Sequence, residues 1–177
     1  MEEEISSSND EIEKILEKEK NNIEINLIKE ELSEFEYELP SFEGLAEDFD
    51  IERALDKESS FLLREIRKLI AEKLSAYLQL FETFMNPTSP PMFIFSALRN
   101  LDEKDREKIK KLYKNFSKYQ LLSVKLDTIY NEENEAKFIN QAYNEWQKCK
   151  TEIHQIIEKL EVCTTEKSDN NQIGYFN

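Results

Sequence analysis

The stretch that decides the fold runs from residue 133 to residue 162 and reads ENEAKFINQAYNEWQKCKTEIHQIIEKLEV. Its apolar residues recur in alternating steps of three and four, the spacing of a helix that buries one continuous seam. Because the seam is unbroken, the pattern predicts a single long helix. The predicted seam consists of Ile139, Ala142, Trp146, Cys149, Ile153, Ile156 and Leu160.

A second long helix is predicted directly before this one. Asp102 is a favourable N-cap, and Asp105 three residues later forms a variant of the capping box. The helix is expected to extend to about Tyr130, where the segment 131–134, NEEN, makes a tight turn. A turn this short forces the two helices into an antiparallel hairpin. The side chains expected to point inward are Ile109, Leu112, Phe116, Tyr119, Leu126 and Tyr130.

A further strong helix is predicted over residues 59–85, and the segment NPTSPP at 86–91 ends it. Its prolines favour the first turn of a short apolar crossover helix at 92–99. With only 2 Gly and 4 Pro and 35% charged residues, the composition favours helices over strands. The predicted fold class is therefore all-α: an elongated bundle of three long helices plus a short crossover helix, with an acidic N-terminal arm. The predicted stripe of the first long helix is Leu63, Ile66, Ile70, Leu74, Tyr77, Phe81 and Phe84.

Negative charge is concentrated in the first third of the chain. Residues 1–58 hold 21 of the 38 acidic residues but only 6 of the 24 basic ones, and the remainder is nearly neutral. Charge blocks of this kind mark partner-facing segments rather than folds. We expect an acidic arm over 1–58 that is partly disordered or marginally helical. We further expect a helical bundle over 59–163 that folds without the arm, and a disordered tail over 164–177.

Local signals within the arm predict little regular structure. Pro40 and Gly44 are expected to break any helix, and Asp50 is expected to cap a short helix over 51–56. A marginal helix is expected further upstream, where apolar residues recur at roughly helical spacing. Its predicted stripe is Ile12, Leu16, Ile23, Leu27, Leu32 and Phe35.

The best candidate for an interaction element is the segment 35–49, where aromatic and aliphatic residues are interspersed with carboxylates. Segments of this kind stay soluble and yet dock apolar anchors into the groove of a partner. An equally good interpretation is that the anchors fold back over the body of the same chain. The candidate partner-binding residues are Phe35, Tyr37, Leu39, Phe42 and Phe49.

The helix predicted over residues 102–130 carries a run of lysines with interleaved aromatics and no acidic residue from Lys108 to Leu126. A basic stripe with aromatics is one way to hold single-stranded nucleic acid. On a helical wheel the lysines lie mostly opposite the predicted core, which favours a solvated face. We expect the acidic arm and this stripe to attract each other. The stripe consists of Lys108, Lys111, Lys114, Lys118 and Lys125.

Motifs for enzymatic chemistry do not rise above background in this sequence. The only histidine, His154, has no metal-site spacing around it, so a solvated or capping role is favoured. Cys149 lies on the apolar seam and Cys163 lies beyond its end, without a CxxC motif. Carboxylates are too abundant to mark a catalytic pair. We therefore predict a non-enzymatic protein with no catalytic residue, no cofactor and no metal.

The predicted location is the cytoplasm, without membrane contact. The acidic start argues against a secretory signal, and the most apolar stretch, 61–85, carries too many charges to span a bilayer. The predicted function is a helical adaptor or scaffold that binds another protein with a basic or apolar groove surface. It would use the acidic-aromatic arm or an apolar groove of the bundle. The alternative is a nucleic-acid or ribosome-associated protein that uses the lysine stripe, gated by the arm.

Overall fold

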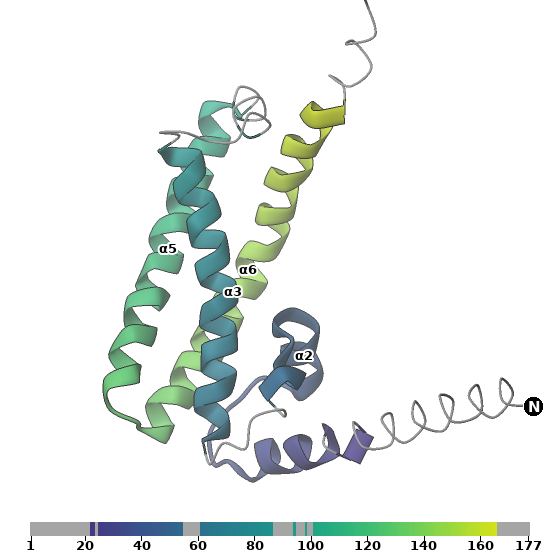
Figure 1. Ribbon diagram of the computed structural model, residues 1–177, viewed down its shortest axis with the longest axis vertical. Coiled ribbons are helices and arrows are strands. Elements are labelled where there is room, and N and C mark those ends of the chain that lie inside the picture. Colours follow the sequence, from purple (N-terminus) through teal and green to yellow (C-terminus); the bar gives the residue numbers. More distant parts are fainter. Residues whose placement is uncertain are drawn as a thin grey trace, which may run out of the picture.

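The computed structural model describes residues 22–23, 25–54, 61–86, 94, 98 and 101–165, with only the backbone for 162–165. Every regular element within these residues is a helix, which confirms the all-α prediction. Figure 1 shows three long helices side by side, with the short helix α2 and residues 25–34 on one flank. The elements are α2 (Phe42–Phe49), the 3-10 turn η1 (Ile51–Ala54), α3 (Leu62–Met85), α5 (Glu103–Thr128) and α6 (Glu132–Thr165).

Helix α3 is the central helix of the bundle, because it packs against both α5 and α6. Aromatic rings connect the helices: the ring centroid of Phe81 on α3 lies 5.9 Å from that of Phe116 on α5. Across the hairpin, Tyr119 of α5 meets Phe138 of α6 edge to face, also at 5.9 Å. In Figure 1 the yellow C-terminal part of α6 diverges from α5, and Lys159 of α6 still reaches the Asp105 carboxylate at the start of α5 at 2.7 Å.

The hairpin between α5 and α6 has the predicted antiparallel form, but its turn is shifted towards the N-terminus. Helix α6 begins at Glu132 because Asn131 caps it. The Asn131 side chain accepts a hydrogen bond from the Asn134 amide at 2.9 Å. The predicted capping box is confirmed at the start of α5, where the Asp105 amide donates to the Asp102 carboxylate at 2.8 Å.

The α6 seam is buried at all seven predicted positions. In the middle of the seam, however, the aromatic rings beside Trp146 belong to α3 and α2 rather than to the hairpin partner α5. The Trp146 ring lies 5.2 Å from Tyr77 of α3 and 5.9 Å from Phe49 of α2. Sequence periodicity identified the buried face of α6 correctly, but the surfaces that cover Trp146 come from α3 and from the acidic arm.

Helix α2 contradicts the prediction that Pro40 and Gly44 break any helix in this segment. Ser41 caps the helix by accepting a hydrogen bond from the Gly44 amide at 3.2 Å, and Gly44 lies inside it. Asp50 ends α2 in the left-handed conformation, with φ 50°. The short helix predicted over 51–56 is the 3-10 turn η1, which ends at Ala54. Burial of the α2 face outweighs the weak helical propensity of glycine. The buried residues of α2 are Phe42, Leu45 and Phe49.

Residues 25–34 are helical, but the predicted stripe of this segment is wrong at two positions. Ile23 and Leu27 are exposed, whereas Ile28 is buried in the core. The inward face is therefore rotated relative to the prediction. The predicted crossover helix at 92–99 lies outside the described residues except for Ile94 and Leu98, which are helical. Residues 1–21 and 166–177 also lie outside the described part of the chain, whereas residues 164 and 165, predicted as tail, belong to α6.

Candidate functional site

The aromatic anchors of the acidic arm face the body of this same chain. Phe42 and Phe49 belong to the buried core, and the other three candidates are half-buried against it: Phe35, Tyr37 and Leu39. The backbone just before α2 is also tied to the bundle, since the Asn140 amide donates to the Glu38 carbonyl at 3.0 Å. Of the two interpretations that the sequence leaves open, the described structure shows the fold-back arrangement for these residues.

Helix α2 approaches α6 closely at a single glycine. A Cβ atom on Gly44 would lie 2.5 Å from the hydroxyl oxygen of Tyr143, which is well inside van der Waals contact. One turn and a half later, Phe49 packs its ring 5.9 Å from Trp146 and 6.4 Å from Tyr143. The absence of a side chain at Gly44 therefore lets the aromatic anchors of α2 reach the surface of α6.

Asp48 is the polar counterpart of these apolar contacts. Its carboxylate accepts a hydrogen bond from the Gln147 amide at 2.5 Å and forms an ion pair with Lys150 at 3.4 Å. Partial burial tends to raise the pKa of Asp48, but the N–H groups of Trp146 and Gln147 and the charge of Lys150 together lower it. The Trp146 indole N–H therefore helps to lower the Asp48 pKa, although it forms no hydrogen bond of ordinary geometry. Lys73 completes the cluster, 4.7 Å above the Trp146 ring, and also donates to the Asp48 carbonyl.

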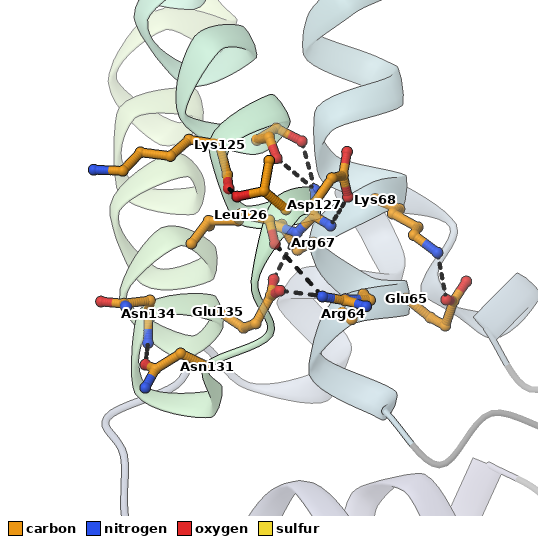
Figure 2. Close-up of polar contacts among 12 residues, drawn as sticks. Arg64, Glu65, Arg67, Lys68, Lys125, Leu126, Asp127, Asn131, Asn134 and Glu135 are labelled. Carbon is orange, nitrogen blue, oxygen red and sulfur yellow. Dashed lines mark hydrogen bonds and ion pairs between the residues drawn. The ribbon is translucent and has the colours of Figure 1, made fainter.

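A second polar cluster lies inside the bundle at the hairpin end (Figure 2). Arg67 of α3 is fully buried and donates to Glu135 of α6 at 2.6 Å. It also donates to the Ser123 hydroxyl at 2.6 Å and to Asp127 at 2.5 Å, both on α5. One guanidinium therefore joins all three long helices, and its charge is balanced by two carboxylates.

Arg64 lies one helical turn before Arg67 and extends the same cluster. Its guanidinium faces the Glu135 carboxylate at 3.6 Å, an ion pair rather than a hydrogen bond. It also lies 5.0 Å above the Tyr130 ring, which in turn contacts Phe61 at 4.4 Å. Burial, with the charges of Glu132 and Glu135, raises the pKa of Tyr130 and keeps its hydroxyl protonated at neutral pH. The cluster holds the ends of three helices together.

Sequence reasoning missed this cluster, although a signal was present. Arg67 follows Leu63 by four residues and precedes Ile70 by three, so it occupies a position on the predicted apolar stripe. Glu135 likewise lies four residues before Ile139, in line with the seam of α6. A charged residue on each of two buried stripes indicates a buried ion pair, because a lone buried charge is strongly unfavourable.

The predicted lysine stripe lies on α5, and four of its five members are exposed: Lys111, Lys114, Lys118 and Lys125. Lys108 is half-buried and pairs with Glu152 at 3.9 Å. The same outer face carries two large apolar residues, Leu121 at 72% exposure and Val124 at 55%. Helical spacing of three and four places Lys118, Leu121 and Lys125 in neighbouring turns. We call Lys114, Lys118, Leu121, Val124 and Lys125 the α5 outer face.

Cys149 and His154, which the sequence singled out, lie in different environments on α6. Burial, with the nearby Glu145 carboxylate, raises the pKa of the Cys149 thiol to about 11, so the thiolate nucleophile is not populated at neutral pH. His154 is exposed and pairs with Glu158 at 3.2 Å on its own helix. Among the described residues, no group of three or more His, Cys, Asp or Glu side chains is arranged to hold a metal ion. None of the described helices has the length and apolarity needed to cross a membrane.

No family model matches the chain, and neither a characterised protein nor a solved structure showed significant similarity to it.

Proposed function

We propose that the chain is a non-enzymatic helical adaptor that binds an acidic segment of another protein through the α5 outer face. The observation that carries the proposal is the exposure of Leu121 and Val124 between lysines on a helix whose opposite face is fully used by the core. Large apolar side chains that stand together in water and are rimmed by charge are typical of docking surfaces.

The chemistry of the face indicates the partner. Lys114 and Lys125 form no ion pair with the described residues, so their charges are available to a ligand. An amphipathic segment with two or three apolar anchors would cover Leu121 and Val124, and carboxylates at its edges would meet the lysines. We propose the contact on α5 rather than on the acidic arm, because Phe42 and Phe49 of the arm lie in the core and the other candidate anchors are half-buried against it.

The proposal is tested by affinity capture from the cells that make the protein. Three baits are compared, the first of which is the wild-type chain. The second, the α5 variant, is the full chain with Leu121→Asp and Val124→Asp, which removes the apolar anchors and repels an acidic partner. A matched control carries Gln141→Asp and Thr151→Asp, two exposed α6 positions with the same change in charge. We expect a protein that the wild-type chain and the control recover but the α5 variant does not. Equal recovery by all three baits would contradict the proposal.

A second candidate function is the binding of single-stranded nucleic acid, favoured by the run of exposed lysines on α5. Phosphate contacts make such binding strongly dependent on salt. Fluorescence anisotropy with a labelled oligothymidine tests it against a variant with Lys114→Glu, Lys118→Glu and Lys125→Glu. Affinity that falls steeply with salt and is lost in this variant, yet survives the uncharged change Leu121→Ser, would favour nucleic acid over an acidic protein.

A further inference from the structure

Helix α2 contacts the bundle in the manner of a bound peptide helix. Its buried residues Phe42, Leu45 and Phe49 stand at positions i, i+3 and i+7, the spacing by which an amphipathic helix lies in a groove. The turn η1 continues the buried surface through Ile51 and Ala54. The outward side of α2 carries the exposed residues Glu43 and Glu47, and Glu43 pairs with Lys29 of the preceding helical segment at 2.7 Å.

The receiving surface is built by α3 and α6 and has distinct chemical features. Tyr143 and Trp146 supply aromatic contacts, and a side chain at the position of Gly44 would force the end of the Tyr143 side chain to shift. Lys73 and Lys150 place positive charge around Asp48. We call this surface of α3 and α6 the α2 groove.

The size of α2 indicates that its folding and its docking are one event. A helix of 8 residues is not stable in water by itself, so α2 is helical only while it lies in the groove. The Arg67 cluster that joins α3, α5 and α6 has no member in α2. Departure of α2 would therefore leave the contacts of that cluster in place and expose Trp146.

We propose that the α2 groove is a helix-binding site that α2 itself occupies, and that an acidic amphipathic helix of another protein competes for it. The groove selects a helix with aromatic or leucine anchors at i, i+3 and i+7, glycine at i+2 and a carboxylate at i+6. The charge complementarity between Asp48 and Lys150 and the lack of space at Gly44 support this selectivity. The groove is separate from the α5 outer face, so this inference stands independently of the proposed function.

The test uses the full chain and a labelled peptide of residues 40–54, PSFEGLAEDFDIERA, with blocked termini. Leu45→Asp in the full chain places a charge on a fully buried anchor and removes α2 from the groove without changing the groove itself. Because a site that is occupied most of the time binds a competitor weakly, we expect the peptide to bind this variant at least about tenfold more tightly than wild type. A peptide with the same Leu45→Asp change should not bind.

A second variant keeps the proposal testable if Leu45→Asp loses its helical circular dichroism. Gly44→Val retains all the anchors but places branched methyl groups against Tyr143. It should also raise peptide affinity, whereas Leu121→Asp with Val124→Asp should leave peptide affinity at the wild-type value. The proposal is overturned if neither folded variant binds the peptide more tightly than wild type, or if the altered peptide binds equally well. Unfolding of both variants would overturn it too, because α2 would then be an indispensable part of the core.

Discussion

Arg67 of α3 and Glu135 of α6 are both fully buried, and their charged groups lie 2.6 Å apart. The pair is part of a cluster that reaches α5 through Ser123 and Asp127. A buried pair of this kind fixes the relative position of helices, because any slippage leaves a charge without a partner in a region of low dielectric. Apolar seams alone tolerate slippage by a helical turn more readily.

Loss of one partner of the buried pair should be far more damaging than loss of both. Arg67→Met leaves the Glu135 carboxylate buried without its strongest donor and should lower the free energy of unfolding by about 3–5 kcal/mol. The double variant, Arg67→Met with Glu135→Leu, should recover much of that loss. Urea denaturation measures both, with the exposed Glu158→Gln as a control. Additive losses in the double variant would show that the two residues do not act as a pair.

Trp146 should be one of the most sensitive positions in the chain. Trp146→Ala removes a ring that contacts Phe49 and Tyr77 and should cost about 3–5 kcal/mol of stability, measured by denaturant unfolding. Trp146→Phe keeps part of the packing and should cost less. An unchanged unfolding midpoint for Trp146→Ala would mean that α2 and α3 do not enclose the ring in solution.

The attachment of α2 should weaken in acid because of Asp48. The pKa of the Asp48 carboxyl in the folded protein lies below the usual value of 3.8. At pH values between the folded and the unfolded pKa, the unfolded chain therefore binds more protons than the folded chain. The stability that Asp48 contributes is therefore complete above about pH 5 and is lost as pH falls through its folded-state pKa. Asp48→Asn should lower the melting temperature at pH 7, and the difference from wild type should shrink below pH 4. A difference that stays constant from pH 7 to pH 3 would argue against the carboxylate contacts.

Cys149 should behave as an inert core residue. Its pKa of about 11 and its burial protect the thiol from alkylation in the folded protein at pH 8. In a Cys163→Ser background, iodoacetamide should add to Cys149 only at the rate at which the bundle opens, and mild urea should accelerate the reaction. Rapid alkylation without urea, followed by mass spectrometry, would place Cys149 at the surface.

Residues 38–54 should contribute measurably to the stability of the bundle. The sequence predicts that residues 59–163 fold alone, but Leu45, Phe49 and Ile51 of the arm are buried in the common core. Each such side chain contributes about 1.5–3 kcal/mol when buried. We expect a fragment of residues 59–165 to be helical but several kcal/mol less stable than residues 22–165. Equal melting temperatures would show that the arm only rests on the surface.

Much of the bundle follows from local signals. The alternating steps along α6 and the pair Asp102 and Asp105 depend only on residues a few positions apart, which is why the seam and the capping box are confirmed. Helix α2 could not be predicted in this way. Gly44 looks like a helix breaker until Tyr143, distant in sequence, is seen to fill the space beside it. The partner of Arg67 is equally distant, since Glu135 lies 68 residues further along the chain.

The charged residues of the candidate site could be predicted from the sequence, but the exposed apolar residues beside them could not. The lysines of α5 are visible in the sequence, and they do lie on the outer side of the helix. Leu121 and Val124 were not singled out, because a helical wheel does not reveal that a third helix leaves that side of α5 uncovered. The aromatic anchors of the arm were visible too, but whether they meet a partner or the chain itself depends on the surface of α3 and α6.

The central claim, that the α5 outer face meets an acidic partner protein, is tested most directly by site-specific photo-crosslinking in the cell. A photoreactive amino acid replaces Leu121 in one variant and the exposed Thr151 of α6 in another. We expect a discrete protein adduct from position 121, lost when Lys118 and Lys125 are both changed to Glu, and none from position 151. No adduct from position 121, or the same adducts from both positions, would contradict it.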